Sequence, residues 1–337
     1  MQKRGAGAEV QVLGIDRGCL NPQNLRMRNK HFVIGLLFVA ACAPGDPYPL
    51  PAGPPGPQGT SLVGVPLVPL TTISEANQTN LEEAHAGFLA APTDADAQIW
   101  LGRRFAYPGY YRMAIEVFTD GIATHPEDAR FLRHRGHRYI SVRELDKAIA
   151  DLTEAANLEQ GKEDRIEPDG QPNERGIPTS TLQSNIWYHL GLAQYLQGDL
   201  PRALSSYKEC LARRRGPDGI VAASYWLYMI HRRMGNPEEA EAILEPINPD
   251  LDIIENHAYH NLLLMFKGER SPDDLLDAAF SAEGSSNSAV AYGVGNWFLM
   301  NGDEARAFEV FERILESSQW AAFGYIAAEV EVARRRE

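Results

Sequence analysis

A spaced triplet of small and large apolar residues recurs along this chain with a period of 34 residues between its first two copies. In the first copy a glycine, Gly102, is followed 12 positions later by Ala114 and 16 positions later by Phe118. The same spacing returns in Gly136, Ala148 and Leu152, in Gly191, Ala203 and Tyr207, and in Gly295, Ala307 and Phe311. Such self-similarity is typical of repeat proteins, in which one small structural unit stacks on the next.

Two helices joined by a short turn account for each copy of the triplet. The apolar residues around it have the spacing of the buried face of a helix. Only small side chains leave room where two packed helices come closest, so we expect the glycine of the first helix and the alanine of the second at that place. A further glycine recurs at the turn between the two helices, at Gly109, Gly198, Gly235 and Gly302. Glycine suits the left-handed conformation that commonly ends a helix.

The third copy gives the most specific indication of the kind of repeat. Its sequence, WYHLGLAQYLQGDLPRALSSYKECL (Trp187–Leu211), resembles the tetratricopeptide repeat (TPR) over most of its length. The resemblance implies an all-α fold, a right-handed α-solenoid of about six TPR helix-turn-helix units with helices that close its two ends. It also implies a scaffold that binds other proteins rather than an enzyme.

The triplets divide a solenoid of residues 75–337 into repeats. We expect these at about 95–128, 129–160, 184–217, 221–254, 255–287 and 288–321. The fourth repeat keeps the alanine, Ala240, but has Tyr228 in place of the glycine. The fifth lacks the small residues, and we still expect helices at about 257–266 and 272–282.

Three further segments complete the expected solenoid. Helices at 75–89 and 320–335 should close its two ends, because the outermost repeats otherwise expose an apolar face. The interval between Gly136 and Gly191 exceeds the period by 21 residues. The excess falls in the insertion 161–184, which is rich in Pro, Gly and charged residues and should form a loop on the rim.

The N-terminal region resembles a bacterial lipoprotein signal. A short basic segment precedes ten mainly apolar residues, 32–41, which end in Val-Ala-Ala before Cys42. Ten residues are too few to span a bilayer but fit the apolar part of a cleavable signal. We therefore expect 27–41 to be a signal peptide and Cys42 to be lipidated; a buried apolar helix or strand at the start of a domain is the alternative.

This interpretation has consequences for the neighbouring segments and for location. Residues 1–26 should be a mis-assigned or disordered extension, with the true start at Met27. The Pro-rich stretch 42–74 should be a semi-rigid tether. Because Ala43 follows the lipidated cysteine, we expect a lipid-anchored protein of the bacterial outer membrane that faces the periplasm.

Charge and cysteine content exclude several classes of function. The net charge is −13, and the +4 carried by residues 1–41 leaves −17 for the rest of the chain. Nucleic acid is therefore not an expected partner, because binding phosphates requires a basic surface. Only three cysteines are present, Cys19, Cys42 and Cys210, too few and too scattered for a disulfide framework or a CxxC zinc site.

No motif for catalysis or for a cofactor is found. The sequence has no nucleophile elbow, phosphate-binding glycine loop, dinucleotide fingerprint or HExxH helix. His134 with His137, and His257 with His260, stand three residues apart on expected helices, a spacing that suits two ligands of a metal. A metal-dependent hydrolase that uses these pairs and the 161–184 insertion is the alternative to a scaffold; solvated or groove-facing histidines are the favoured interpretation, and we expect no cofactor or metal.

The resemblance assigns the lining of the concave groove to the first helix of each repeat. The residues at its groove positions are Arg103, Tyr107, Arg130, Arg133, His137, Tyr188, Tyr195, Tyr225, Met229, Arg232 and Arg233. Arginine binds carboxylates through two parallel hydrogen bonds and tyrosine gives rigid contact area, so we expect a groove for an acidic peptide or protein segment. Alternatively, these arginines pair with glutamates of adjacent repeats and stay solvated.

Ile99 and Arg103 stand where the carboxylate-clamp TPRs of chaperone cofactors have Lys and Asn, so that activity is not implied. The sequence therefore predicts a lipid-anchored scaffold or adaptor that acts in assembly or maintenance of the cell envelope.

Overall fold

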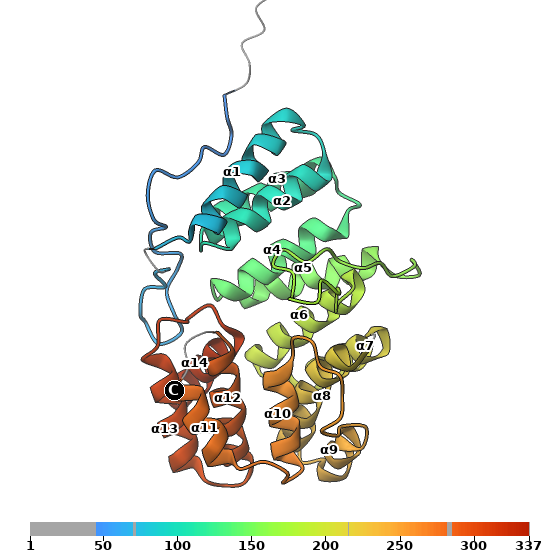
Figure 1. Cartoon of the computed structure of the whole chain (residues 1–337), viewed down its shortest axis with the longest axis vertical. Helices are drawn as coiled ribbons and strands as arrows, with labels where there is room; N and C mark the ends of the chain where they lie inside the picture. The colour runs from blue at the N-terminus through green and yellow to red at the C-terminus, as the bar shows by residue number, and fades with distance from the viewer. Residues whose placement is uncertain (1–44, 70–71, 215, 282–284, 337) are drawn as a thin grey trace, which may run out of the picture. The chain divides into compact units, whose positions relative to one another are not determined.

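The computed structural model describes residues 45–69, 72–214, 216–281 and 285–336. These residues form fourteen α-helices and, apart from two isolated bridges, no β-structure (Figure 1). The helices are α1 (Glu75–Ala90), α2 (Ala95–Ala106), α3 (Tyr111–Thr124), α4 (Ala129–Ser141), α5 (Leu145–Leu158), α6 (Leu182–Gln197), α7 (Leu200–Arg213), α8 (Gly216–Arg233), α9 (Pro237–Leu244), α10 (His257–Phe266), α11 (Pro272–Ser281), α12 (Ser285–Met300), α13 (Glu304–Leu315) and α14 (Phe323–Arg336). The expected extension 1–26, the signal peptide 27–41 and the lipidation site Cys42 lie outside the described residues.

Helix pairs stack in chain order, which confirms the predicted fold class. In the pairs α2/α3, α4/α5, α6/α7, α8/α9 and α12/α13 the second helix packs on the first, and most pairs continue directly onto the next. The fifth pair differs: α10 packs on α8 and α12, and α11 packs on α12. Because this pair lacks the small residues that let two helices approach closely, its helices are held by their neighbours instead.

The residues of the repeated triplet meet inside each pair. A Cβ atom added at Gly136 would lie 2.7 Å from Leu152, and one at Gly191 would lie 2.8 Å from Tyr207. The glycine thus makes room for the large residue of its own triplet, which packs against the backbone of the first helix. The alanines Ala114, Ala148, Ala203, Ala240 and Ala307 are fully buried, and Gly102 and Gly295 face Phe118 and Phe311 in the same way.

The turn inside a pair uses the left-handed conformation. Gly198 has φ +89° and ends α6, and Asp199 caps α7 by accepting a hydrogen bond from the Arg202 amide. In the second pair Arg143 stands at the turn and adopts φ +67°. A non-glycine residue with this φ is held there by its surroundings. Its guanidinium forms an ion pair of 2.6 Å with Glu329 of α14, and both side chains are buried.

Residues 46–69, which we term the N-terminal strap, pack against helices from both ends of the chain. The Tyr48 hydroxyl donates to Asp120 of α3, and Leu67 is buried. The Val68 carbonyl accepts from the indole of Trp320 at 2.8 Å, close to the start of α14. The sequence predicted a tether over 42–74, and the strap differs because two large side chains bury themselves on the helices.

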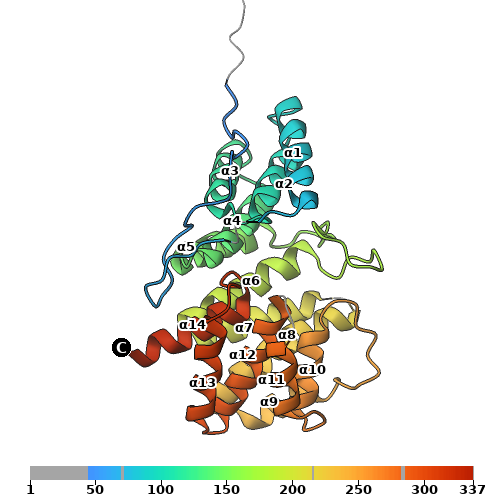
Figure 2. The same cartoon turned by 60° about the vertical axis from the view of Figure 1, so that its left-hand side comes forward.

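The last helix contacts earlier repeats as well as its neighbours (Figure 2). Helix α14 packs on α12, α13 and α6. Glu331 of α14 forms an ion pair with Arg233 of α8, and Arg334 donates to the Leu196 carbonyl of α6 at 2.8 Å. These contacts hold the third and fourth helix pairs to the last helix. Among the described helices, none has both the length and the hydropathy needed to cross a bilayer.

Candidate functional site

The predicted groove residues fall into four groups. Three tyrosines, Tyr188, Tyr195 and Tyr225, belong to the core. The Tyr195 hydroxyl lies 2.7 Å from the hydroxyl of Tyr292, and the Tyr188 hydroxyl accepts from the indole of Trp226 at 2.9 Å. Met229 is also fully buried. In this part of the solenoid the first helices therefore pack on one another, and their tyrosines are not available to a ligand.

The second group lies at the end of α8. Arg233 pairs with Glu331 and also donates to the Tyr195 hydroxyl at 2.9 Å. Arg232 donates to the Tyr228 hydroxyl at 2.8 Å and to the Met300 carbonyl at 3.3 Å. Both arginines are thus engaged by residues of this chain, and they hold α8 to the last repeats.

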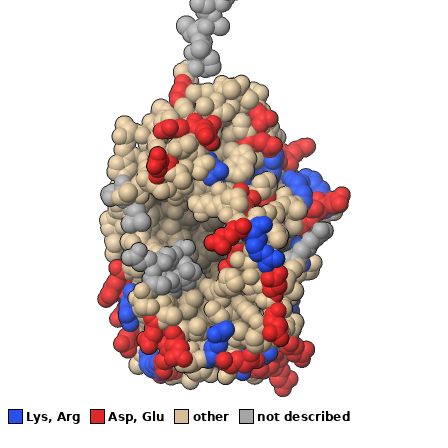
Figure 3. Space-filling view, viewed as in Figure 1, with Lys and Arg blue, Asp and Glu red and all other residues tan. Residues whose placement is uncertain are grey.

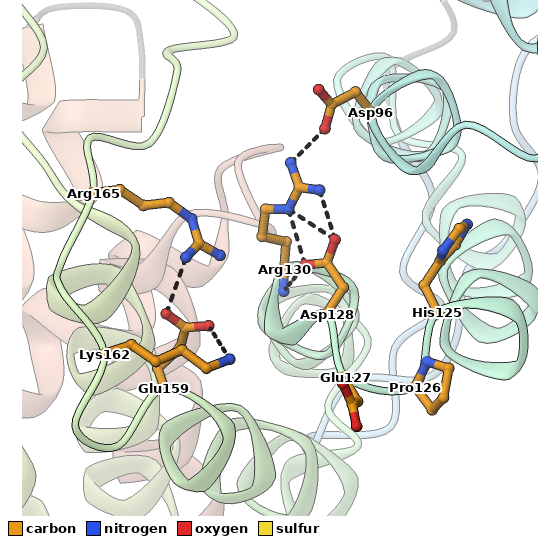
Figure 4. Close-up of a pocket in the computed structure, with 9 residues that line it drawn as sticks. All are labelled: Asp96, His125, Pro126, Glu127, Asp128, Arg130, Glu159, Lys162 and Arg165. Atoms are coloured by element: carbon orange, nitrogen blue, oxygen red, sulfur yellow. Dashed lines mark hydrogen bonds and ion pairs between the residues drawn. The ribbon is translucent and has the colours of Figure 1, made fainter.

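Arg130 forms the third group, at an open pocket of about 740 Å³ (Figure 4). It donates to Asp128 at 2.6 Å and to Asp96 of α2 at 2.5 Å. Burial alone would raise the pKa of Asp128, but hydrogen bonds and attraction from Arg130 hold it below its usual range. On the other side of the pocket Glu159 pairs with Lys162 and Arg165. The basic side chains of this pocket are therefore neutralised within the protein.

The fourth group, on α2 and α4, meets the inserted loop, which we define as residues 159–181 between α5 and α6. Arg133 forms an ion pair of 2.9 Å with Glu167, and fewer than a tenth of either side chain is exposed. Arg103 donates to the Pro168 carbonyl at 2.8 Å, and Arg104 donates to the Gly170 carbonyl at 2.9 Å. We expected this insertion on the rim; instead its 167–170 part lies on the arginines predicted to bind a ligand.

The inserted loop also lies directly against Tyr107. Its hydroxyl lies so near to Gly170 that a Cβ atom there would overlap it. The loop extends from this point to the segment before α10, where the Thr179 hydroxyl donates to Glu255 at 2.8 Å and Arg175 pairs with Asp252 at 2.8 Å. The inserted loop therefore joins the first repeats to the fifth.

Arg138 of α4 lies beside this group and was not among the predicted residues. Its guanidinium lies 5.2 Å from the ring centre of Tyr111, a distance that allows a cation–π interaction. It donates no hydrogen bond and pairs with no carboxylate within the part of the chain that the structure describes. Burial lowers the pKa of Arg138 to about 10, and the positive charges of Arg133 and Arg103 contribute to the lowering. The side chain still carries its charge at neutral pH.

The Tyr111 ring, on which Arg138 stacks, also lines a cavity of about 380 Å³. Tyr107, Tyr111 and Trp320 contribute its aromatic lining, and the rings of Tyr111 and Trp320 meet edge to face at 5.5 Å. We term it the Tyr111 cavity. Figure 3 shows that one face of the molecule is hollowed near its middle, and acidic and basic side chains lie to the right of that hollow. The Tyr111 ring therefore separates two features: it lines the Tyr111 cavity, and it carries the cation Arg138, which is not itself among the lining residues.

Two histidines, one on α4 and one on α6, lie near Arg138. The rings of His137 and His189 are 4.2 Å apart, and Phe323 of α14 contacts both. Burial lowers the pKa of both imidazoles, and the neighbouring Arg138 and Arg133 lower it further. These rings are neutral at pH 7 and contribute apolar surface and hydrogen-bonding capacity rather than charge.

The histidine pairs do not form a metal site in the described residues. His134 contacts Arg133 at 3.0 Å, and His260 contacts the Asn248 carbonyl at 2.8 Å, while His257 is exposed. No group of three or more His, Cys, Asp or Glu side chains stands close enough there to hold a metal ion. Cys210 is buried, as befits a small apolar side chain.

Comparison with known proteins finds similarity of fold only. No protein-family model and no curated protein matches the sequence. A crystal structure of MamA matches with 17% identity over 52% of this chain and 91% of its own, with a TM-score of 0.39. YrrB, described as a TPR protein with an unusual peptide-binding site, matches with 11% identity over 76% of this chain and 100% of its own, at 0.39.

The Rap conjugation regulator of plasmid pLS20, solved with the Phr* peptide, matches with 17% identity over 77% of this chain and 73% of its own, at a TM-score of 0.48. These similarities are partial, so the fold rests on the helix pairs of this chain and on the packing of their triplets. By those criteria it is an all-α solenoid of TPR-like repeats.

Proposed function

We propose that this protein is a scaffold that binds a carboxylate-bearing segment of another protein or peptide on the surface formed by α2 and α4. The observation that carries this proposal is Arg138, a partly buried guanidinium that has no carboxylate partner among the described residues and stacks on Tyr111, whose ring lines the Tyr111 cavity. Partial burial removes water from the charge, and a charge without a partner is costly in such a place. A ligand carboxylate compensates that cost by accepting two parallel hydrogen bonds.

The surroundings favour an acidic ligand over other chemistry. Arg103 and Arg133 lie close enough to affect the ionisation of Arg138, so positive charge is concentrated here in a protein of net charge −13. Tyr107 and Tyr111 supply flat contact surface for the apolar part of a peptide. Hydrogen bonds to an ionised acceptor are about twice as strong as neutral ones, which favours carboxylates over amides.

The scaffold is held in shape before any ligand arrives. The N-terminal strap, the Arg143–Glu329 ion pair and the contacts of α14 tie early repeats to late ones. Binding to a preorganised surface costs less ordering entropy than binding to a mobile one. This arrangement suits a protein that positions a partner and performs no chemistry on it.

Anchoring to the bacterial envelope through Cys42 is part of the proposal. Asp46 lies four residues beyond this cysteine, and its carboxylate contacts His85 of α1 at 2.8 Å. A residue spans at most about 3.6 Å, so the strap would start within about 14 Å of the lipid attachment. The scaffold would then work close to the membrane surface, in assembly or maintenance of the envelope. Replacing Cys42 with Ser should release the protein from the membrane fraction, and continued membrane association would contradict the anchor.

The binding proposal is tested by capture of partners from detergent-solubilised envelope. Tagged wild-type protein, the Arg138→Glu variant and a matched Arg202→Glu control are compared by mass spectrometry. Arg202 is three-quarters exposed on α7, and within the described residues it pairs only with its neighbour Asp199. We expect at least one partner that wild type and control retain and Arg138→Glu loses. Partners that all three proteins retain equally would refute binding at Arg138.

A further inference from the structure

We infer that the Glu167–Gly170 part of the inserted loop is a built-in occupant of the peptide-binding surface, and that the ligand which replaces it is an extended peptide with a carboxylate in the place of Glu167. This inference rests on the proposed function and deepens it. It adds a second subsite, at Arg103, Arg104 and Arg133, next to the one at Arg138.

The contacts of this segment are those of a bound peptide. One side-chain carboxylate enters a buried ion pair with Arg133, and two backbone carbonyls, two residues apart, accept from Arg103 and Arg104. The flanking side chain of Ile166 is 61% exposed and contributes no anchor. Recognition through backbone carbonyls and one charged anchor is independent of most of the sequence. Another chain with the same backbone path and one carboxylate would satisfy the same arginines.

The fit of the internal occupant is incomplete. The Oε2 atom of Glu167 and the Nε atom of Arg133 are both buried without a hydrogen-bond partner within the described part of the chain. Only one oxygen of the carboxylate therefore pairs with the guanidinium. Buried polar atoms without a partner are unfavourable. A carboxylate that is not restrained by the loop can approach Arg133 with both oxygens, which gives a competing ligand an advantage.

The loop can leave without unfolding a helix. Its base is closed by the Leu182 amide, which donates to the Arg165 carbonyl at 2.9 Å, and by an isolated bridge between Ile166 and Thr181. Its far end is held by Arg175 and Asp252, whose side chains are 47% and 73% exposed, and by hydrogen bonds from Asn173 and Thr179 to the exposed Glu255. Exposed ion pairs contribute little to stability. Displacement therefore sacrifices the Glu167–Arg133 ion pair, the two hydrogen bonds from Arg103 and Arg104, which a peptide with the same backbone path would replace, and exposed contacts at the far end of the loop.

Displacement would also leave the surface strongly basic. Glu167 is the only carboxylate that pairs with Arg103, Arg104, Arg133 or Arg138 among the described residues. Once it leaves, four guanidiniums remain near one another. An acidic peptide would be attracted to these four guanidiniums more strongly than to the surface covered by the loop. The loop therefore limits access in two ways: it neutralises positive charge and it occupies the binding surface.

The test uses a fluorescein-labelled peptide with the sequence of residues 164–171, DRIEPDGQ, and a matched peptide with Gln in place of Glu. Fluorescence anisotropy measures binding to the full chain as wild type and as Glu167→Gln. We expect the acidic peptide to bind the variant about 10-fold more tightly than wild type. The Gln peptide should bind neither, and Arg103→Ala introduced into the variant should weaken binding.

A second variant keeps the test decisive if Glu167→Gln fails to fold. The double change Asp252→Ala and Glu255→Ala loosens only the far end of the loop, where both side chains are exposed. It should also bind the acidic peptide more tightly than wild type, and added peptide should speed amide exchange at residues 163–172. Equal binding to wild type and both variants, or no binding by any of them, would contradict the proposal that the loop occupies the peptide-binding surface. Capture of partners that depends on Arg138 would still uphold the proposed function, so the two failures are distinguishable.

Discussion

At the scale of single residues, close packing and buried charge explain which substitutions should destabilise the fold. The small residue of each triplet is required because a large residue of the same repeat occupies the space beside it. Gly191 lies against Tyr207 in this way. Arg143 adopts a conformation that is unfavourable for any residue but glycine and is stabilised by Glu329. Two predictions follow from these contacts.

The variant Gly191→Ala should lower the free energy of unfolding by about 1–3 kcal/mol, because the added methyl overpacks a filled core. Gly87→Ala is the matched control, since α1 leaves open space at that position. It should raise the free energy by about 0.5–1 kcal/mol, because alanine favours helices. Urea denaturation measures both. Similar values for the two variants would contradict the packing of the triplet.

The variant Glu329→Gln should lower the free energy of unfolding by about 3 kcal/mol, because it leaves the Arg143 charge buried without its partner. Glu209→Gln breaks the half-exposed ion pair with Arg213 on α7 and should cost less than about 1 kcal/mol. Thermal and urea unfolding of the two proteins give this comparison. A loss at Glu329 no larger than that at Glu209 would show that the pair is not buried in solution.

At the scale of helices and loops, local sequence patterns were sufficient to predict the repeats but not the conformation of the loops. Periodicity identified even the fifth pair, with α10 at His257–Phe266 inside the predicted 257–266 range. The strap and the inserted loop differ from expectation because their order depends on distant partners, such as Tyr48 with Asp120 and Glu167 with Arg133. No pattern within a Pro-rich segment reveals such pairs. Arg138 was not predicted because the family's groove positions include its neighbour His137 instead.

The contact of α4, α6 and α14 should make stability depend on pH. His137 and His189 have lowered pKa values because they are buried beside arginines. Below about pH 6.5 the unfolded chain takes up protons that the folded chain excludes, so the free energy of unfolding falls with acidification. The melting temperature should therefore drop between pH 7.5 and 5.5. His137→Gln should reduce this dependence, whereas His257→Gln, at an exposed residue, should leave it unchanged; a flat profile in wild type would contradict the burial of the pair.

At the scale of the whole molecule, the strap and α14 turn an open stack of repeats into a structure whose ends support each other. The Gln58 carbonyl accepts from Arg112 of α3 at 2.7 Å, and the Val68 carbonyl accepts from Trp320 near α14. A repeat array in which units contact only their neighbours would transmit no such coupling. Stability of the first and last repeats should therefore change together.

Replacing Leu67 with Ala tests this coupling. Leu67 is 2% exposed, so its truncation should cost about 2–4 kcal/mol. Hydrogen exchange should accelerate in both α3 and α14, although these helices are far apart in the sequence. Leu62→Ala, at a residue that is 42% exposed, is the control and should change neither. Faster exchange in α3 alone would mean that the strap does not join the two ends.

The central claim is that a carboxylate of a partner binds at Arg138. Calorimetric titration of the acidic segment of a captured partner tests it most directly, with wild type, Arg138→Gln and the control Arg202→Gln. We predict that Arg138→Gln weakens the affinity at least about 10-fold, as expected for losing roughly 1.4 kcal/mol or more of a charge-assisted pair. The control should match wild type. Equal affinity of all three proteins would contradict the claim.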